Sequence, residues 1–413
     1  MLRIIGLTDT VACDDGRIVA DDGTGAADVL DAAGCVLTPG LVNAHHHLLQ
    51  SAFRTVPGTR HVPMADWLGV MAGSYRAVGV DAELCFAAAE VGLAESLLCG
   101  VTTVADHHLT WPTEAGDGVD LARATAAAAA RLGAGLVFVR GSAGDDPEQA
   151  ARSAEAIADA LAGQVQVAVG PAGVHSDGPE TFRLLAEVAA SRGLRRRTQA
   201  NEQVDVLRAA ERYGRRPLDL LDDWGWLAPD VTLAHLCEIT EDEATRIASA
   251  GVTATHAPGC DLPMGWGLAR VGDLLDRGVA VGLGTSGGGS NDAGHLLADA
   301  RLAMQVSPLT GRPLTAAEVV TMATAGSAAG LGRPDLGSLA VGSAADICCW
   351  DVTGVADAGV ADPVAGLVWA APGRRPRHVV VGGKVVVQDG QLVADDERAV
   401  AARLTKLLEA RRR

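Results

Sequence analysis

The feature that most constrains the fold of this chain is an alternation of short β-branched runs with longer stretches rich in alanine and leucine. Such alternation is typical of βα units around a parallel sheet. Eight strand candidates can be counted, at Val36–Ala44, Thr102–Asp106, Leu136–Gly141, Gln166–Gly170, Leu194–Gln199, Val231–Leu236, Gly251–Thr255 and Val279–Gly284. Between them, Thr240–Glu243 and Thr315–Glu318 have the spacing of a capping box and predict two helix starts. Eight such units predict an α/β fold, a (β/α)8 TIM-like barrel.

The segments on either side of the predicted barrel have a different sequence pattern, in which short apolar runs are separated by turn-forming residues. His378–Val387 reads as a hairpin that turns at Gly382 and Gly383. Because both flanks are rich in β signals, we expect them to form one small sandwich together. The predicted domains are a small β-sandwich from residues 1–37 and 337–393, a barrel from 38–336 and a C-terminal helix from 394–413.

The charge of the chain restricts its partners. The 413 residues contain 34 Lys and Arg against 51 Asp and Glu, a net charge of −17. This excess repels phosphate backbones and anionic lipid, so we expect a small-molecule substrate, no nucleic acid and no membrane. We see no leader-like N-terminal pattern and no apolar run near the ~20 residues of a membrane span, and therefore expect a cytoplasmic protein. Eight scattered cysteines without a C-x-x-C pair argue against a zinc–thiolate knuckle and a disulfide framework, and most are expected to be small buried residues.

Polar residues that could carry chemistry stand where the predicted strands end, which is where barrels of this kind place their active sites. His45 and His47 are two residues apart, so on an extended chain their imidazoles lie on the same side and can bind one cation. The other strand ends carry Asp106, His107 and His108, then Gln199 and Glu202, then His235, Cys237 and Glu238, then His256, and finally Thr285 and Ser286. We expect these side chains to meet at one mouth of the barrel.

Six motifs in chain order resemble the amidohydrolase superfamily, in its branch of oxoguanine, guanine and cytosine deaminases and triazine hydrolases. They are Thr38–His47, Gly100–His108, Leu233–His235, Thr255–Pro258, Ser290–His295 and Gly342–Asp346. The resemblance spans roughly residues 38 to 393 and implies a homodimer. It also implies one divalent ion, zinc or iron, that activates water for attack on an amidine-like ring carbon.

Carried over by position, the resemblance implies that His45 and His47 are metal ligands, that Glu202 shuttles protons and that His235 orients the substrate. Two positions depart from the family pattern: Gln199 stands where a strand-five histidine is expected, and Ser286 where a strand-eight aspartate is expected. Two good nitrogen ligands remain where a tight site offers three or four, so we expect weak or absent metal binding. The missing aspartate also removes a general base that contributes ~10²–10⁴ in rate.

The remaining candidates are substrate contacts and a nucleophile. Gln199 and Arg197 share the inward side of the fifth strand, and we expect the Arg197 guanidinium to pair with Glu202, Glu238 or a substrate carboxylate. His108, His256 and Glu238 are further substrate-binding candidates. Ser286 is a third catalytic candidate beside Glu202 and His235, but nothing in the sequence places a base beside its hydroxyl.

Three functions fit these residues. The first is a divergent enzyme of this fold that acts on a small nitrogen-rich or carboxylated metabolite by acid–base chemistry from Glu202 and His235, with weak or absent metal. The second is a metal-dependent deaminase or C–N hydrolase of a purine- or triazine-like heterocycle. The third is a non-catalytic pseudoenzyme or binding subunit. Metal content and ammonia release distinguish the first two, and ligand binding without turnover would identify the third.

Overall fold

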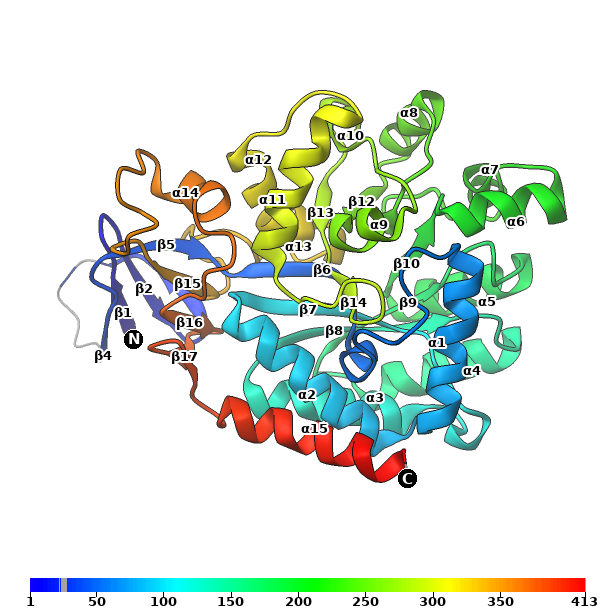
Figure 1. The fold of residues 1–413 in the computed structure, drawn as a ribbon, viewed down its shortest axis with the longest axis horizontal. Coiled ribbons are helices and arrows are strands. Elements are labelled where there is room, and N and C mark those ends of the chain that lie inside the picture. The colour runs from blue at the N-terminus through cyan, green and yellow to red at the C-terminus, as the bar shows by residue number, and fades with distance from the viewer. Residues whose placement is uncertain (22, 24–27, 413) are drawn as a thin grey trace.

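The computed structural model describes residues 1–21, 23 and 28–412, and its centre is the predicted barrel (Figure 1). The parallel barrel strands are β6 (Leu41–His47), β7 (Val101–His108), β8 (Gly135–Ser142), β9 (Gln166–Pro171), β10 (Arg195–Ala200), β11 (Val231–His235), β12 (Thr253–His256), β13 (Val281–Leu283) and β14 (Ser286–Gly287). Successive strands pair in parallel from β6 to β13, so the predicted (β/α)8 barrel is confirmed.

The last two short strands close the barrel. β13 pairs with β12 through Val281 and Leu283, and after two intervening residues β14 pairs with β6, with Ser286 opposite His46. Thr285 lies at the bend, where its hydroxyl accepts a hydrogen bond from the Asn43 amide at 2.7 Å. The eighth barrel strand is therefore split into two short strands, of which β13 pairs with β12 and β14 pairs with β6. The second pairing brings Ser286 beside the histidines of β6.

The predicted first strand, Val36–Ala44, is wrong as a single element. It contains two strands of different sheets, β5 (Cys35–Pro39) in the small sandwich and β6 in the barrel. They meet at Gly40, where a Cβ atom would lie 2.3 Å from the Thr102 hydroxyl, so only glycine permits this close approach. As a consequence His45 and His47 lie within β6 rather than beyond it.

Helices cover the outside of the barrel (Figure 1). They are α1 (Met64–Val78), α2 (Ala82–Leu98), α3 (Val119–Leu132), α4 (Pro147–Ala160), α5 (Pro179–Arg192), α6 (Gln203–Tyr213), α7 (Pro217–Asp223), α8 (Glu241–Ser249), α9 (Pro258–Met264), α10 (Val271–Asp276), α11 (Leu296–Val306), α12 (Ala316–Thr321) and α13 (Ser327–Leu331). Three 3-10 helices, η1 (Leu48–Ala52), η2 (Thr113–Ala115) and η3 (Ser307–Leu309), and one π-helix, η4 (Met322–Gly326), supplement them in the described chain. The capping boxes at Thr240 and Thr315 are present, which confirms the two predicted helix starts.

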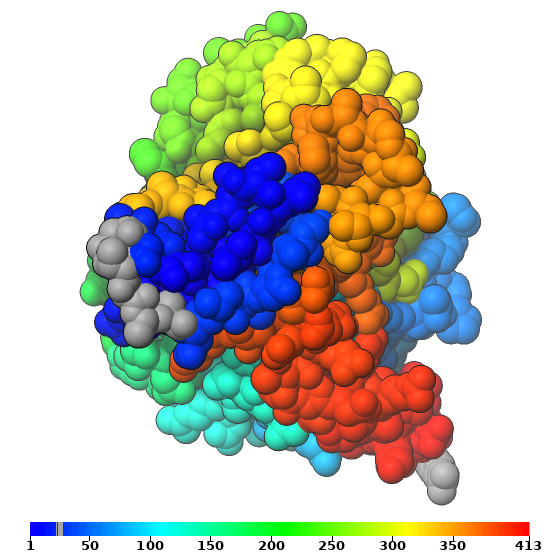
Figure 2. All heavy atoms as spheres, turned by 90° about the vertical axis from the view of Figure 1, so that its left-hand side faces the viewer, coloured from blue at the N-terminus to red at the C-terminus, as the bar shows by residue number. Residues whose placement is uncertain are grey.

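The small sandwich consists of two sheets, on the face shown in Figure 2. One sheet has the order β3-β2-β1-β4, from Arg17–Val19, Thr10–Asp14, Leu2–Ile5 and Asp28–Asp31; the other has the order β18-β17-β16-β15-β5, from Gln391–Leu392, Lys384–Gln388, His378–Val381, Ile347–Asp351 and β5. β16 and β17 form the predicted hairpin, with positive φ at Gly382 and Gly383. All eight cysteines are free and buried, as predicted.

The C-terminal segments tie the two parts together. α14 (Pro363–Trp369) follows β15, and α15 (Glu397–Arg411) lies along α2, where Arg403 pairs with the buried Glu90 at 2.9 Å. In the described part of the chain, no helix combines the length and the apolar character that a membrane crossing needs. The predicted ranges 1–37 and 394–413 include residues 22, 24–27 and 413, which lie outside the described residues.

Candidate active site

A cavity of about 1070 Å³ opens at the carboxyl ends of the barrel strands. Its lining includes His47, Gln199, Glu202, His235 and Ser286, so the strand-end rule brings these predicted residues together. Tyr75 and three of the chain's seven tryptophans, Trp67, Trp111 and Trp266, also line it. A polar floor with aromatic walls suits a flat, nitrogen-containing ring.

The histidines of β6 alternate in direction as the period of a strand requires. His46 turns toward the bend of the eighth strand, where its Nδ1 lies 2.9 Å from the Thr285 hydroxyl. His45 and His47 lie on the other side, with ring centroids 4.9 Å apart. The His47 Nδ1 donates a hydrogen bond to the His107 carbonyl at 2.6 Å. The lone pair of its Nε2 therefore remains available to bind a metal ion. Burial lowers the pKa of His47 to about 4, so the ring is neutral and its lone pair is available.

His235, at the end of β11, connects the histidines with two carboxylates. Its Nδ1 lies 2.8 Å from Asp261 Oδ1, and its Nε2 lies 3.3 Å from His45 Nε2 and 3.8 Å from Glu202 Oε1. Burial, the largest single effect, lowers the pKa of His235, but the charges of Asp261 and Glu202 together raise it to about 9. Asp261 thus fixes which ring nitrogen faces the floor of the cavity.

Glu202 lies just beyond β10, at the N-terminus of α6. It is fully buried in the protein and its Oε2 atom has no hydrogen-bond partner. Burial raises the pKa of this carboxyl to about 7, although the nearby His235 lowers it in part. A carboxyl group that ionises near neutral pH and keeps one oxygen free can accept and return a proton.

Four strand-end residues around this floor have left-handed backbone conformations, which are uncommon for residues other than glycine. They are Asn201, His235, Leu236 and Ser286, with φ values of 52°, 71°, 56° and 53°. Such conformations cost free energy and gather at functional sites. No imidazole or carboxylate of the described chain hydrogen-bonds to the Ser286 hydroxyl, which lines the cavity. The structure therefore gives no support to a nucleophilic role for Ser286.

Three predicted substrate contacts lie away from the cavity. The Arg197 guanidinium is buried and donates to the carbonyls of Ala44 and Gly330, the latter at 3.1 Å, so its predicted pairing with Glu202 or Glu238 is wrong. Glu238 is exposed to solvent and does not line the cavity. His256 is buried behind the lining, with its Nδ1 unpartnered. None of the three side chains lines the cavity, and their predicted contact with the substrate stays a prediction.

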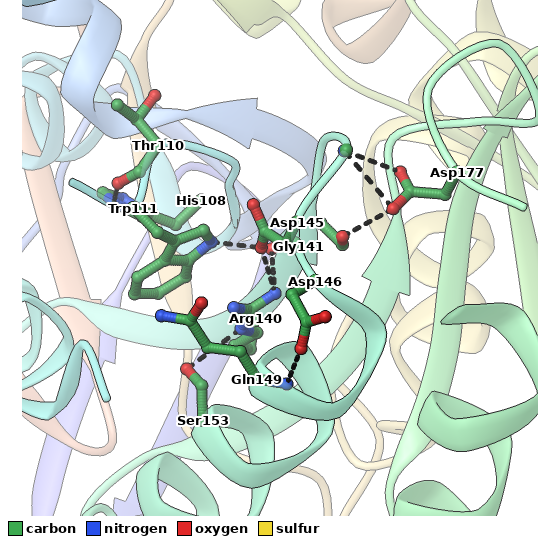
Figure 3. A network of polar contacts seen from close by, with 12 residues as sticks. His108, Thr110, Trp111, Arg140, Gly141, Asp145, Asp146, Gln149, Ser153 and Asp177 are labelled. Atoms are coloured by element: carbon green, nitrogen blue, oxygen red, sulfur yellow. Dashed lines mark hydrogen bonds and ion pairs between the residues drawn. The ribbon is translucent and has the colours of Figure 1, made fainter. Parts of the chain in front are cut away.

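His108 does line the cavity, as part of an outer wall shown in Figure 3. Its Nε2 donates to the Thr110 carbonyl at 3.0 Å, and its ring meets Trp111 edge-on, with centroids 4.6 Å apart. The Trp111 indole donates to the Gly141 carbonyl at 2.7 Å. Arg140 lies 4.7 Å from the Trp111 ring and donates to Asp145 at 2.7 Å and to Gly141 at 2.9 Å. The contacts of this wall hold its shape.

The lining contains a second histidine–carboxylate pair, which could not be predicted from the sequence patterns. His175, in the loop after β9, lies 2.7 Å through its Nδ1 from Asp205 Oδ1. Burial lowers the pKa of His175, but Asp205 raises it overall, and Glu202 adds to the rise. The signal was weak because His175 stands four residues beyond the end of β9, where strand-end reasoning does not reach.

The donor chemistry of the floor fits a divalent cation. His45 and His47 are neutral imidazoles in the absence of an ion, and the Nδ1 contacts of His47 and His235 are the kind that orient metal-binding histidines. No family aspartate or third family histidine stands beside them, since Gln199 and Ser286 occupy those positions. The predicted weakness of metal binding stays a prediction.

Known proteins similar to this chain agree with its fold. Residues 36–386 match the Amidohydrolase family. The 8-oxoguanine deaminase of Pseudomonas aeruginosa is 34% identical over 94% of this chain and 92% of its own length. The 5-methylthioadenosine/S-adenosylhomocysteine deaminase of Halobacterium salinarum is 33% identical over 94% and 90%. The crystal structure of atrazine chlorohydrolase TrzN from Arthrobacter aurescens TC1, complexed with zinc, superposes with a TM-score of 0.91 at 35% identity, covering 99% of this chain and all of that one.

These similarities confirm the predicted resemblance and the predicted class, a hydrolytic enzyme acting on C–N bonds. They favour the metal-dependent deaminase interpretation over the two others, and a degenerate or non-catalytic protein receives no support from them. The chain belongs to the amidohydrolase family.

Proposed function

We propose that this protein hydrolyses a purine- or triazine-like heterocycle at a ring carbon, releasing an exocyclic amino group as ammonia, with a bound divalent cation. The observation that carries the proposal is the Glu202 carboxyl at the base of an aromatic cavity: its Oε2 has no hydrogen-bond partner, and its Oε1 lies 3.8 Å from His235 Nε2. The reaction balances simply: water supplies oxygen to the ring carbon and a proton to the departing amine.

His45 and His47 would hold the cation, and His47 would do so through its Nε2 atom, because its Nδ1 is already engaged with a carbonyl. When bound, such an ion supplies Lewis acidity and makes water acidic enough to act as a nucleophile at neutral pH. Zinc is present in the structure of the similar atrazine chlorohydrolase TrzN, which supports a divalent ion here.

Proton transfer falls to Glu202. With a pKa raised to about 7 by burial, its carboxyl can take a proton as water attacks and return it to a ring nitrogen or to the leaving amine. The free Oε2 atom gives that proton a place to bind. Gln199 lines the same floor and offers an amide that can hydrogen-bond to a heterocycle.

The walls of the cavity favour flat aromatic substrates. Trp67 and Trp266 meet edge-on with centroids 5.3 Å apart, and both indole nitrogens donate to backbone carbonyls, at 3.0 and 3.4 Å. Because these hydrogen bonds fix the rings, a heterocycle can stack without first ordering the wall.

The test is turnover by purified protein that is stripped with a chelator and reloaded with zinc. We expect ammonia release from at least one of 8-oxoguanine, 5-methylthioadenosine and an amino-triazine, and loss of that activity on stripping. A Glu202→Gln preparation serves as the blank for contaminating deaminases. If the loaded protein releases no ammonia from these substrates above that blank, the proposal is wrong.

A further inference from the structure

The loop after β9 turns one histidine back into the cavity. His175 lines the cavity, and its Nδ1 lies 2.7 Å from Asp205 Oδ1, which also accepts the His175 backbone N–H at 3.0 Å. Gly173 permits this arrangement, because a Cβ atom there would lie 2.7 Å from both His175 Nδ1 and Asp205 Oδ1. The His175 Nε2 makes no hydrogen bond within the described chain, so it is the ring atom that can bind a ligand.

The same loop is fixed to the loop beside it. Asp177 is buried and accepts hydrogen bonds from the Ser142 hydroxyl at 2.6 Å and the Gly144 N–H at 3.3 Å, at and just beyond the end of β8 (Figure 3). The Asp177 N–H donates to the Gly173 carbonyl at 3.2 Å. Because the backbone is held on both sides of His175, the imidazole is ordered before a ligand binds.

Asp205 makes this imidazole a cation. The Asp205 carboxylate is fully buried, and His175 is the one basic side chain of the described chain within salt-bridge distance of it. A buried carboxylate needs such a cation, since an unpaired charge in the interior is costly. Burial by itself lowers the pKa of His175, but the charges of Asp205 and Glu202 outweigh burial and raise that pKa overall. A protonated imidazole donates through both nitrogens, so Nε2 is a hydrogen-bond donor.

The His175–Asp205 pair lies close to Glu202. Glu202 caps α6 and Asp205 follows in its first turn, and side chains three residues apart share one face of a helix. A heterocycle whose reacting carbon meets Glu202 therefore has another part of its ring system near His175. Because Asp205 already balances the imidazolium and Glu202 adds negative charge, a neutral acceptor suits Nε2 better than a carboxylate or a phosphate.

We propose that His175 and Asp205 form a substrate-binding subsite, in which the His175 Nε2 N–H donates a hydrogen bond to an oxo oxygen of the heterocycle. This inference rests on the proposed function and narrows its substrates to oxo-substituted rings, such as oxopurines, over rings that carry only amino or alkyl groups. His175 determines the specificity and Asp205 positions it. A site with a buried donor of this kind rejects the analogue that lacks the acceptor.

The experiment measures binding to the full-length protein after a chelator has removed metal, so that turnover does not interfere. The fluorescent probe is 2-aminopurine, which lacks an oxo group, and guanine, its 6-oxo counterpart, is measured by displacement of the probe. We expect guanine to bind about 10–100-fold more tightly, the effect of one hydrogen bond from a charged group. His175→Phe should remove this preference by weakening guanine binding alone, with the affinity for 2-aminopurine little changed.

Two further variants separate recognition from structure. Asp205→Asn keeps an acceptor for the His175 ring but removes the charge that keeps it protonated, so it should lower the preference for guanine without lowering the affinity for 2-aminopurine. His295→Phe is the matched control. It removes an imidazole outside the cavity, whose Nε2 lies 3.2 Å from the Arg374 carbonyl, and should leave the preference unchanged.

The wild-type comparison needs no variant, so the proposal can fail even if His175→Phe does not fold. Equal affinities for the two purines, or no binding of either, would overturn the subsite. A preference for guanine that survives in His175→Phe would overturn it as well and would assign recognition of the oxo group to Gln199. If ammonia release persists in any of these cases, the proposed function stands. If neither purine binds and no substrate turns over, both proposals fail.

Discussion

The floor and the outer wall of the cavity are both built from buried polar side chains, but they differ in how these are paired. On the floor, Glu202 Oε2 and Asp261 Oδ2 have no partner. In the wall, Arg140 reaches Asp145, Ser153 and the Gly141 carbonyl, and the Trp111 indole reaches the same carbonyl (Figure 3). Unpaired buried groups cost stability and paired ones do not, so the floor is arranged for chemistry and the wall for shape.

The largest expected effect is on the catalytic rate: replacing Glu202 on the cavity floor should lower kcat without lowering the stability of the protein. Glu202→Gln removes the proton carrier while preserving the shape of the side chain, so we expect kcat to fall by ~10²–10⁴. The melting temperature should stay the same or rise, because the variant no longer carries a buried carboxyl. Glu238→Gln, at an exposed position outside the cavity, is the matched control and should change neither quantity. A variant that loses stability in proportion to activity would assign Glu202 a structural role.

The wall should respond in the opposite way. Arg140→Met leaves Asp145 without its partner and removes the cation above Trp111. Breaking a buried ion pair on one side costs about 3–5 kcal/mol, and we expect a loss toward the lower end because Asp145 is partly exposed. Denaturant unfolding measures it. Arg152→Met, which breaks an exposed pair with Glu148 on α4, should cost little. Equal losses in the two variants would refute the structural role of the wall.

The pH dependence of stability tests the cost of unpaired groups beside the floor. Asp106 lines the cavity with Oδ2 unpartnered, and burial raises its pKa to about 7, although the Leu48 N–H lowers it in part. In the unfolded chain an aspartate titrates near ~3.9, so between these values the native state binds more protons and stability falls as pH rises. Below about pH 4 the two states bind equally.

Asp106→Asn removes this dependence and keeps an acceptor for Leu48. The free energy of unfolding of the variant relative to wild type should therefore increase from pH 4 to pH 7, by roughly 4 kcal/mol, and stay level above. Urea titrations at several pH values measure the difference. A difference that is independent of pH would show that Asp106 titrates normally in the folded protein.

The sequence predicted the barrel because its signal is repeated eight times and does not depend on any one strand. It failed at Val36–Ala44, since a continuous apolar run does not reveal that the chain changes sheets at Gly40. Period-two reasoning placed His45 and His47 correctly on one side of β6. The same rule cannot tell how deep a residue lies: Arg197 is two residues before Gln199, so it sits ~6–7 Å further into the barrel and meets backbone carbonyls.

Beyond the strand ends, the sequence lost its predictive value for a physical reason. The left-handed backbone at His235 and Leu236 breaks the alternation of directions, and Glu238 consequently points to solvent. The loop after β9 likewise carries His175 back into the cavity with no periodic pattern. The aromatic wall could not be predicted either, because Trp67, Trp111 and Trp266 come from three separate segments that only the fold brings together.

The smallest expected effect concerns the shape of the wall alone. Trp111→Phe keeps an aromatic face but removes the indole N–H that donates to the Gly141 carbonyl, a loss worth about 1 kcal/mol. If this hydrogen bond fixes the ring for stacking, the ring gains freedom that substrate binding must remove, so KM should rise about fivefold with kcat little changed. Trp224→Phe, which packs against Phe182 and Tyr213 away from the cavity, is the matched control. A fall in kcat without a change in KM would instead mean that the wall takes part in the chemistry, and the distinction between a reactive floor and a shape-giving wall would be wrong.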